Sequence, residues 1–223
     1  MFSLNKSYYF VFQSTFIMNG KDYLKDISEI KSIMNRSSRL VSLSGLSGIL
    51  AGIYALIGAF AANFLLVSYQ SSSTSISLLP ISFLEYFLVG IALLVLILST
   101  VTALLLSSKK AKKSGEKLWD ATTKRLLINF TIPLFTGGAF CIILYQYGLI
   151  GLIAPTTLIF YGLACVNASK YTLGDIRYLG LLNICIGLIA TQFIGYGLYF
   201  WALGFGILHI IYGIVLYNKY DKK

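Results

Sequence analysis

The sequence predicts an all-α membrane protein with six transmembrane helices, and three observations support this prediction. Of its 223 residues 57% are hydrophobic and 12% charged, with a mean hydropathy of +0.78. A soluble domain is about 45–50% apolar and about 25% charged. The 18 lysines and arginines fall into four groups, separated by long apolar stretches at 40–108, 126–169 and 178–218. Glu85 is the one charged residue in these stretches.

Each stretch is long enough for two helices, because about 20 residues cross the hydrocarbon layer. An even number of crossings per stretch places all basic groups on one side, which the positive-inside rule identifies as the cytoplasm. We therefore expect three helical hairpins with both termini cytoplasmic. The predicted spans are 42–66, 83–106, 126–146, 149–167, 178–196 and 198–217.

An amphipathic cytoplasmic helix is expected before the first span, within residues 18–40. Its apolar stripe has helical spacing and consists of Tyr23, Ile27, Ile30 and Met34. Residues 1–17 precede a more natural start at Met18, and we expect them to be a disordered or mis-assigned extension. The transmembrane domain then covers 41–218, and 219–223 form a cytoplasmic tail.

The net charge of +10 does not point to nucleic acid, because the basic residues flank apolar spans. We expect them to attract anionic lipid headgroups, above all at Lys109, Lys110, Lys112 and Lys113. Small residues such as Gly48 and Gly52 line the first span. They favour close packing against another helix or a second copy of the chain.

The last two predicted hairpins resemble each other. LIFYGLACVNASKY (158–171) aligns with HIIYGIVLYNKY (209–220), which pairs Tyr161 with Tyr212 and Gly162 with Gly213. Two interpretations stay open. The hairpins are parallel repeats, as in several transporters, or they look alike because both end at a basic inner boundary.

Four polar residues within the predicted spans are candidates for ligand binding: Asn129, Asn183, Gln192 and His209. His209 is the only histidine and lies nine residues before Asn218, which places it about 14 Å from the inner boundary. An ionisable residue at that depth is a functional candidate, but a hydrogen bond to a neighbouring helix accounts for it equally well.

An enzyme is not the expected function. GLSG (45–48) looks like the serine motif of rhomboid-type intramembrane proteases and would pair Ser47 with His209 as catalytic residues. In that family, however, the serine is on the fourth core helix and the histidine continues as H-x-x-G. With one histidine and no paired cysteines, the sequence predicts no metal site and no cofactor.

The chain resembles a family of six-span bacterial integral membrane proteins to which no activity is attached. The matching segments are RSSRLVSLSGLSGILAGIYALIGA (36–59), KKSGEKLWDATTKRLLINFTIPLFTGG (112–138), GLIAPTTLIFYGLACVNASKYTLGDIRYLG (151–180) and GYGLYFWALGFGILHIIYG (195–213). The resemblance implies a bacterial inner-membrane location.

Two functions are expected in preference to the hydrolase. One is a small-solute transport or ligand-binding module, since six short helices also resemble the substrate-binding subunits of vitamin importers. The other is a sensor or scaffold whose inner face binds a cytoplasmic protein partner.

Overall fold

The computed structural model describes residues 26–30, 44–72, 81–113 and 120–222. Residues 26–30 are helical and belong to a unit separate from the remainder. Within them Ile27 and Ile30 are 59% and 63% exposed. The other two stripe residues, Tyr23 and Met34, lie outside the described residues, as does the predicted extension 1–17.

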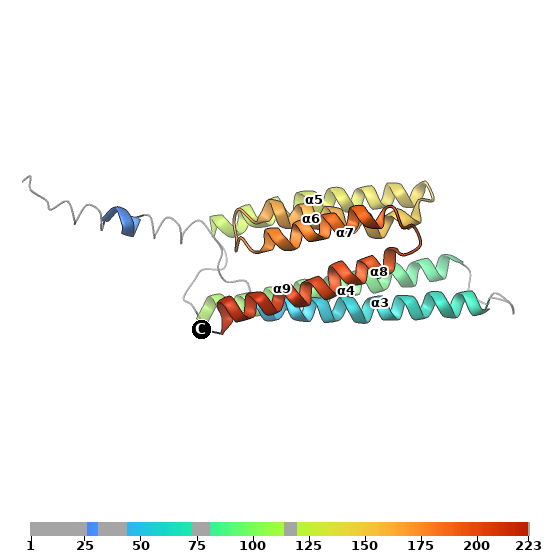
Figure 1. Ribbon diagram of the computed structural model, residues 1–223, viewed down its shortest axis with the longest axis horizontal. Helices are drawn as coiled ribbons and strands as arrows, with labels where there is room; N and C mark the ends of the chain where they lie inside the picture. The colour runs from blue at the N-terminus through green and yellow to red at the C-terminus, as the bar shows by residue number, and fades with distance from the viewer. Residues whose placement is uncertain (1–25, 31–43, 73–80, 114–119, 223) are drawn as a thin grey trace, which may run out of the picture. The chain divides into compact units, whose positions relative to one another are not determined.

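From residue 44 onward the described chain consists of helices joined by short connections (Figure 1). They are α3 (Gly45–Ser72), α4 (Ile81–Lys113), α5 (Ala121–Gln146), the 3-10 turn η1 (Ile150–Leu152), α6 (Ile153–Ala168), α7 (Ile176–Ala190), α8 (Gly197–Trp201), the π-helix η2 (Ala202–Ile207), α9 (Leu208–Leu216) and the π-helix η3 (Tyr217–Asp221). The predicted all-α fold is confirmed for these residues. The four lysines from Lys109 to Lys113 continue α4 instead of starting a loop.

Five of the described helical segments are long and apolar enough to cross a membrane, and α7, with 15 residues, is shorter. Large apolar side chains on these helices face outward: Phe60 is 74% exposed and Phe135 77%. Such surfaces are stable in lipid and costly in water. The protein is therefore a multi-pass membrane protein.

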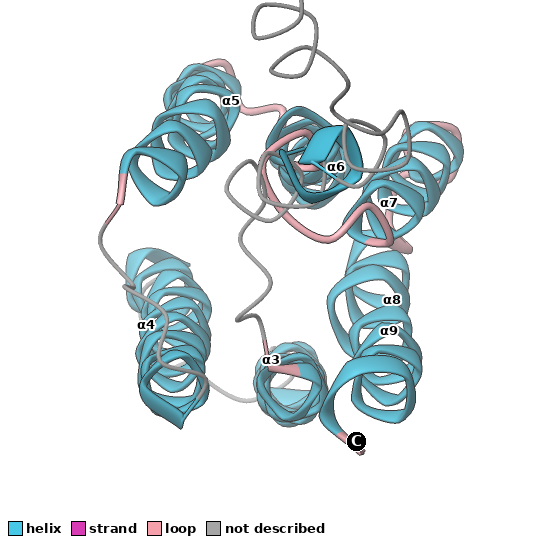
Figure 2. Ribbon diagram, turned by 90° about the vertical axis from the view of Figure 1, so that its left-hand side faces the viewer, coloured by secondary structure: helices cyan, strands magenta, loops and turns pink. Residues whose placement is uncertain are grey.

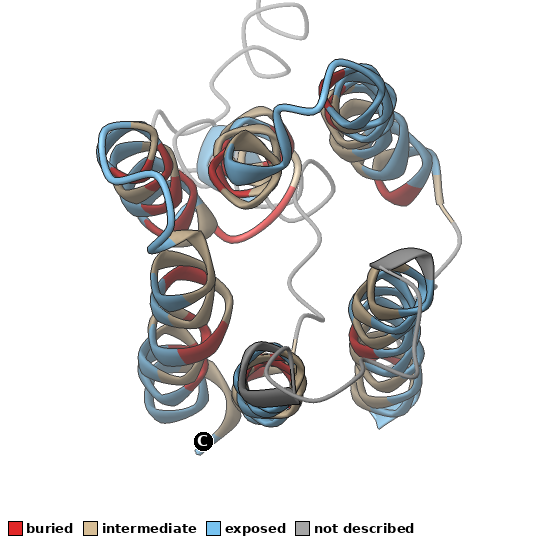
Figure 3. Ribbon diagram, turned by 90° about the vertical axis from the view of Figure 1, so that its right-hand side faces the viewer, coloured by how far each residue is buried: buried red, intermediate tan, exposed pale blue. Residues whose placement is uncertain are grey.

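Seen end-on, the helices from residue 44 follow one another around the unit in the order α4, α3, α8–α9, α7, α6 and α5 (Figure 2). Neighbours in this order pack together, with α3 between α4 and α9, and α6 between α5 and α7. Buried residues lie mainly where helices meet, and exposed ones cover the outer sides (Figure 3). Helices α4 and α5 are joined at one end by the Tyr145 hydroxyl, which donates to Glu85 Oε2 at 2.6 Å.

Both ends of α5 are capped by local hydrogen bonds. At its start the Asp120 carboxylate accepts from the Thr123 backbone N–H at 2.7 Å. Slight burial raises the pKa of the Asp120 carboxyl, but hydrogen bonds from Thr123 and neighbouring N–H groups outweigh it, so this pKa lies below its usual value. At its end Gly148 has φ +72°, and the Leu149 N–H donates to Leu144 O in a Schellman motif.

Helix α7 ends earlier than the predicted span 178–196. The Thr191 hydroxyl donates to Leu188 O at 2.6 Å, and the chain then reverses through Gly195, whose φ of +103° suits glycine. Gln192 consequently lies exposed in the connecting turn, after the end of α7 and not within a helix as expected.

Glycines bring α6 and α7 into backbone contact. A Cβ added at Gly187 would lie 2.7 Å from Ile159 Cγ1 and 3.0 Å from Pro155 O. One added at Gly162 would lie 2.5 Å from Gly180 O. Real Cβ atoms do not come so close, so only glycine permits this packing.

Helices α3 and α9, with η2, meet in the same way. A Cβ added at Gly52 would lie 2.6 Å from both Ile210 Cγ1 and Gly206 O. One added at Gly213 would lie 2.7 Å from Gly45 O.

The two interfaces have equivalent contacts, residue by residue. Each residue of η2–α9 lies 51 positions after its counterpart on α6, and each residue of α3 lies 135 positions before its counterpart on α7. The equivalent pairs are Pro155 and Gly206, Ile159 and Ile210, Gly162 and Gly213, Gly180 and Gly45, and Gly187 and Gly52. The offset of 51 is the one that aligns Tyr161 with Tyr212. The sequence similarity of these segments thus coincides with a shared packing geometry.

The carboxyl-terminal η3 links neighbouring ends of several helices. Asp221 Oδ2 accepts from the Gly45 N–H at 2.7 Å, which caps the start of α3, and its Oδ1 pairs with Lys110 of α4 at 2.6 Å. Lys219 pairs with Asp175 at the start of α7 at 2.9 Å. We call Asp221, Lys110 and the Gly45 N–H the Asp221 clamp.

We predict that Gly52→Ala and Gly187→Ala each lower the melting temperature of the purified protein. Overpacking costs about 1–3 kcal/mol, which exceeds the gain of at most about 1 kcal/mol from replacing a helical glycine by alanine. Gly90→Ala and Gly138→Ala are the controls, since an added Cβ there meets nothing within 4 Å. Equal melting temperatures for the two pairs of variants would contradict the interlocked packing.

We also predict that Asp221→Ala destabilises the protein by about 1 kcal/mol, the usual loss when a helix N-cap is removed. Thermal unfolding in detergent measures the change, with Lys222→Ala as the control because Lys222 is exposed and adjacent. No difference between the two variants would show that the Asp221 clamp contributes nothing to stability.

Candidate functional site

His209 lies in α9 and is 7% exposed, with both ring nitrogens hydrogen-bonded. Nε2 is 2.6 Å from the Tyr161 hydroxyl on α6, and Nδ1 is 2.9 Å from Gly204 O in η2. A carbonyl oxygen only accepts, so Nδ1 carries the hydrogen. In the neutral imidazole Nε2 is then the acceptor, and Tyr161 donates to it.

The π-helix η2 explains why an imidazole is placed here. The Leu208 N–H bonds to Leu203 O five residues back, whereas α9 continues in α-helical register. Such a change of register leaves a carbonyl without a backbone donor. In a membrane span that carbonyl has no water to bind. The His209 Nδ1–H satisfies it at Gly204.

Aromatic side chains surround the Tyr161–His209 pair. The ring of Phe205 lies 5.0 Å from Tyr161 and stacks on His209, and Trp201 lies 5.0 Å from Phe205. Phe130 of α5 meets Tyr161 edge-on at 6.1 Å. This cluster fixes the ring positions and keeps lipid and water from the hydrogen bonds.

Asn183 of α7 is the second predicted site residue near Gly204. It is fully buried, and its Nδ2 donates to Leu179 O in its own helix at 3.0 Å. Its Oδ1 has no hydrogen-bond partner and lies 2.6 Å from the position of a Cβ added at Gly204. The structure thus brings His209 and Asn183 together at one glycine. We call His209, Tyr161, Asn183 and Gly204 the Gly204 site.

Asn129 lies elsewhere, at the contact between α5 and α6. Pro133 has no N–H for the carbonyl four residues earlier, which is that of Asn129. Asn167 Nδ2 of α6 donates to this carbonyl at 2.8 Å. The Asn129 side chain itself donates to Arg125 O. Its role here is to join two helices.

The remaining predicted residues are also apart from the Gly204 site. Gln192 is exposed in the turn after α7, where its amide donates to Thr191 Oγ1. Ser47 is buried on α3, and its hydroxyl donates to Ser44 O at 2.6 Å. Since both nitrogens of His209 bond to other groups, the structure offers no hydrogen-bonded Ser47–His209 pair.

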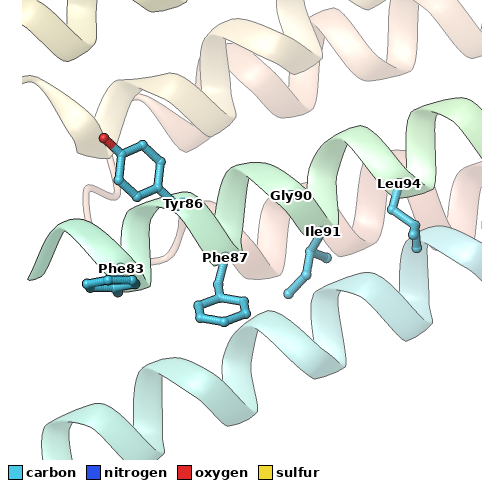
Figure 4. A pocket seen from close by; sticks show the side chains of 6 residues that line it. All are labelled: Phe83, Tyr86, Phe87, Gly90, Ile91 and Leu94. Atoms are coloured by element: carbon cyan, nitrogen blue, oxygen red, sulfur yellow. The ribbon is translucent and has the colours of Figure 1, made fainter. Parts of the chain in front are cut away.

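An apolar groove of about 440 Å³ runs along α4 and contains none of the predicted site residues. Figure 4 shows Phe87 and Ile91 pointing toward α3, and Tyr86 pointing away from it. The walls of this groove suit lipid chains more than a polar solute. Within the described residues no group of three His, Cys, Asp or Glu side chains is placed to hold a metal ion.

Tyr161 and Gly204 are the site residues that the sequence did not identify as such. Tyr161 stood out only as part of the repeat, and a glycine in an apolar helix carries no sign of a change in helical register. Asn167 could have been found, because a proline four residues after Asn129 predicts a free carbonyl that needs a donor.

Comparisons with known proteins provide no relative for this site: no family model, curated protein or solved structure matches the chain.

We predict that the single histidine gives an ¹⁵N spectrum of a neutral imidazole with the hydrogen on Nδ1. Tyr161→Phe should shift the Nε2 resonance and destabilise the protein by about 1–3 kcal/mol, since a buried acceptor loses its donor. Tyr212→Phe is the matched control, because the buried Tyr212 hydroxyl has no partner to lose. A hydrogen on Nε2, or equal effects of the two variants, would contradict the geometry described above.

Proposed function

We propose that the chain is a six-span inner-membrane protein of bacterial type, built as three helical hairpins with both termini in the cytoplasm. Helix α7, with 15 residues or about 22 Å, is the fifth of these spans in chain order and brings their number to six. The turn at 191–196 extends it toward the start of α8. Basic residues at the ends of the spans support this orientation under the positive-inside rule. Exposed Lys109, Lys112 and Lys113 then lie at the anionic headgroups of the inner leaflet.

We further propose that it is a small-solute transport or ligand-binding module with its site at Gly204. The observation that supports this most is the fully buried Asn183, whose Oδ1 has no partner. Leaving a buried acceptor unpaired costs about 1–3 kcal/mol, so a site that keeps one does so for a reason other than stability. A solute with an N–H or O–H donor would bind that oxygen.

The irregular helix beside Asn183 supports the same proposal. Gly204 and Gly206 are both buried within η2, and π-helical turns occur often at functional sites. Transporters commonly bind solutes where a helix departs from regular geometry near the bilayer midplane. His209 and Tyr161 would then position Gly204 and would reach the solute only after their own bond opens.

A sensor or scaffold function is the second candidate. Ile27 and Ile30 are exposed on a helical segment, which suits a cytoplasmic protein partner or a membrane surface. Cross-linking from these two positions in cells distinguishes a protein from a lipid neighbour.

We predict that Asn183→Leu raises the melting temperature of the solute-free protein and abolishes its stabilisation by solute. A leucine removes the unpaired oxygen at similar volume. Thermal shift against a panel of amino acids, nucleobases and water-soluble vitamins measures both effects. Gln192→Leu is the control, because Gln192 is exposed outside the Gly204 site. The proposal fails if no solute in the panel stabilises the natural protein, or if one stabilises Asn183→Leu equally well.

A further inference from the structure

A second groove, of about 380 Å³, runs between α5 and α6 away from the Gly204 site. Its walls are mainly apolar and comprise Pro133, Thr136, Phe160, Leu163 and Val166. The Thr136 hydroxyl donates to Ile132 O at 2.9 Å, so its polar atom is already bonded within α5. The body of the groove therefore suits a hydrocarbon chain.

Polar and charged groups close one end of this groove. Asn167 and Lys170 line it there, at the end of α6 that leads to the inner face. The hydrogen bond from Asn167 Nδ2 to Asn129 O places these two residues at the same height along α6 and α5. Because the two helices are antiparallel, Arg125, one turn before Asn129, lies at the same end as Lys170.

Both cations are available to a ligand. Lys170 and Arg125 are exposed, and within the described residues neither side chain forms an ion pair. By contrast, Lys110 and Lys219 are paired with Asp221 and Asp175. Unpaired cations at the end of an apolar groove match an anionic headgroup attached to an acyl chain.

We propose that the α5–α6 groove is a binding site for an anionic phospholipid of the inner leaflet. One acyl chain lies along Phe160 and Leu163, and the phosphate contacts Lys170 with Arg125 beside it. Free phosphate would leave the apolar part of the groove unused, so the lipid is the ligand that the whole site fits. This site requires a membrane-embedded chain and does not depend on solute binding at Gly204.

Native mass spectrometry of the purified full chain tests the site with three probes: phosphatidylglycerol, phosphatidylcholine with the same acyl chains, and inorganic phosphate. We expect phosphatidylglycerol to be retained in preference to phosphatidylcholine, and inorganic phosphate not to displace it. Lys170→Gln should weaken phosphatidylglycerol retention about fivefold, the effect of one cation near the membrane surface. Leu163→Trp should weaken both lipids by filling the groove.

Lys222→Gln is the matched control, since Lys222 is an exposed lysine that does not line the groove. It should leave retention unchanged. Equal losses in Lys170→Gln and Lys222→Gln would overturn the site in favour of diffuse charge attraction. Equal retention of the two lipids would overturn headgroup selection, and displacement by inorganic phosphate would overturn the role of the acyl chain. Lys170 is exposed, so its replacement preserves the fold, which the melting temperature verifies.

Discussion

The close approach of helix backbones at glycines is the constraint on which the rest of the structure depends. In lipid, apolar side chains gain little by leaving their surroundings, so helices associate through contact and hydrogen bonds. The contacts at Gly52 and Gly187 provide this association at two places. At each, atoms of one helix occupy the space that a side chain would take on the other. The other helices, among them the highly exposed α4 and α5, are held against this framework.

Close packing and the polar site are linked through η2. Gly206 packs against Leu56 of α3, while Gly204, half a turn away, packs against Leu158 of α6. A helix segment that contacts two neighbouring helices through glycines has few side chains of its own that can rearrange. The helix accommodates this packing through its π-helical turn, and His209 donates to the Gly204 carbonyl, which that turn leaves without a backbone donor. The first role of the imidazole is thus structural, because it completes the hydrogen bonding of the backbone.

Charge distribution made the helical segments predictable, because a lysine or arginine cannot lie far inside a lipid-facing span. It could not place the end of α7, which depends on the local bond of Thr191 and the φ of Gly195. For that reason the charge pattern predicts Gln192 within a span, whereas it lies in the turn after α7. The depth of His209 followed from counting residues, but its partner Tyr161 did not, since 48 positions separate the two and no periodicity connects them.

The similarity of the two glycine interfaces suggests where chemistry should be sought. Residues that maintain the packing, such as Gly162 and Gly213, occur at equivalent positions of both interfaces. The fold alone therefore explains them. His209 corresponds to Leu158 at the same offset of 51, so here the two interfaces differ. Both of these residues meet Gly204, one through a hydrogen bond and the other through packing. Asn183 with its unpaired oxygen also lies at Gly204 and corresponds to Gly48 at the offset of 135, whereas Tyr161 has the identical counterpart Tyr212. At His209 and Asn183, unlike at Tyr161, the two interfaces have different residues, so these two polar side chains are not required by the packing that the interfaces share.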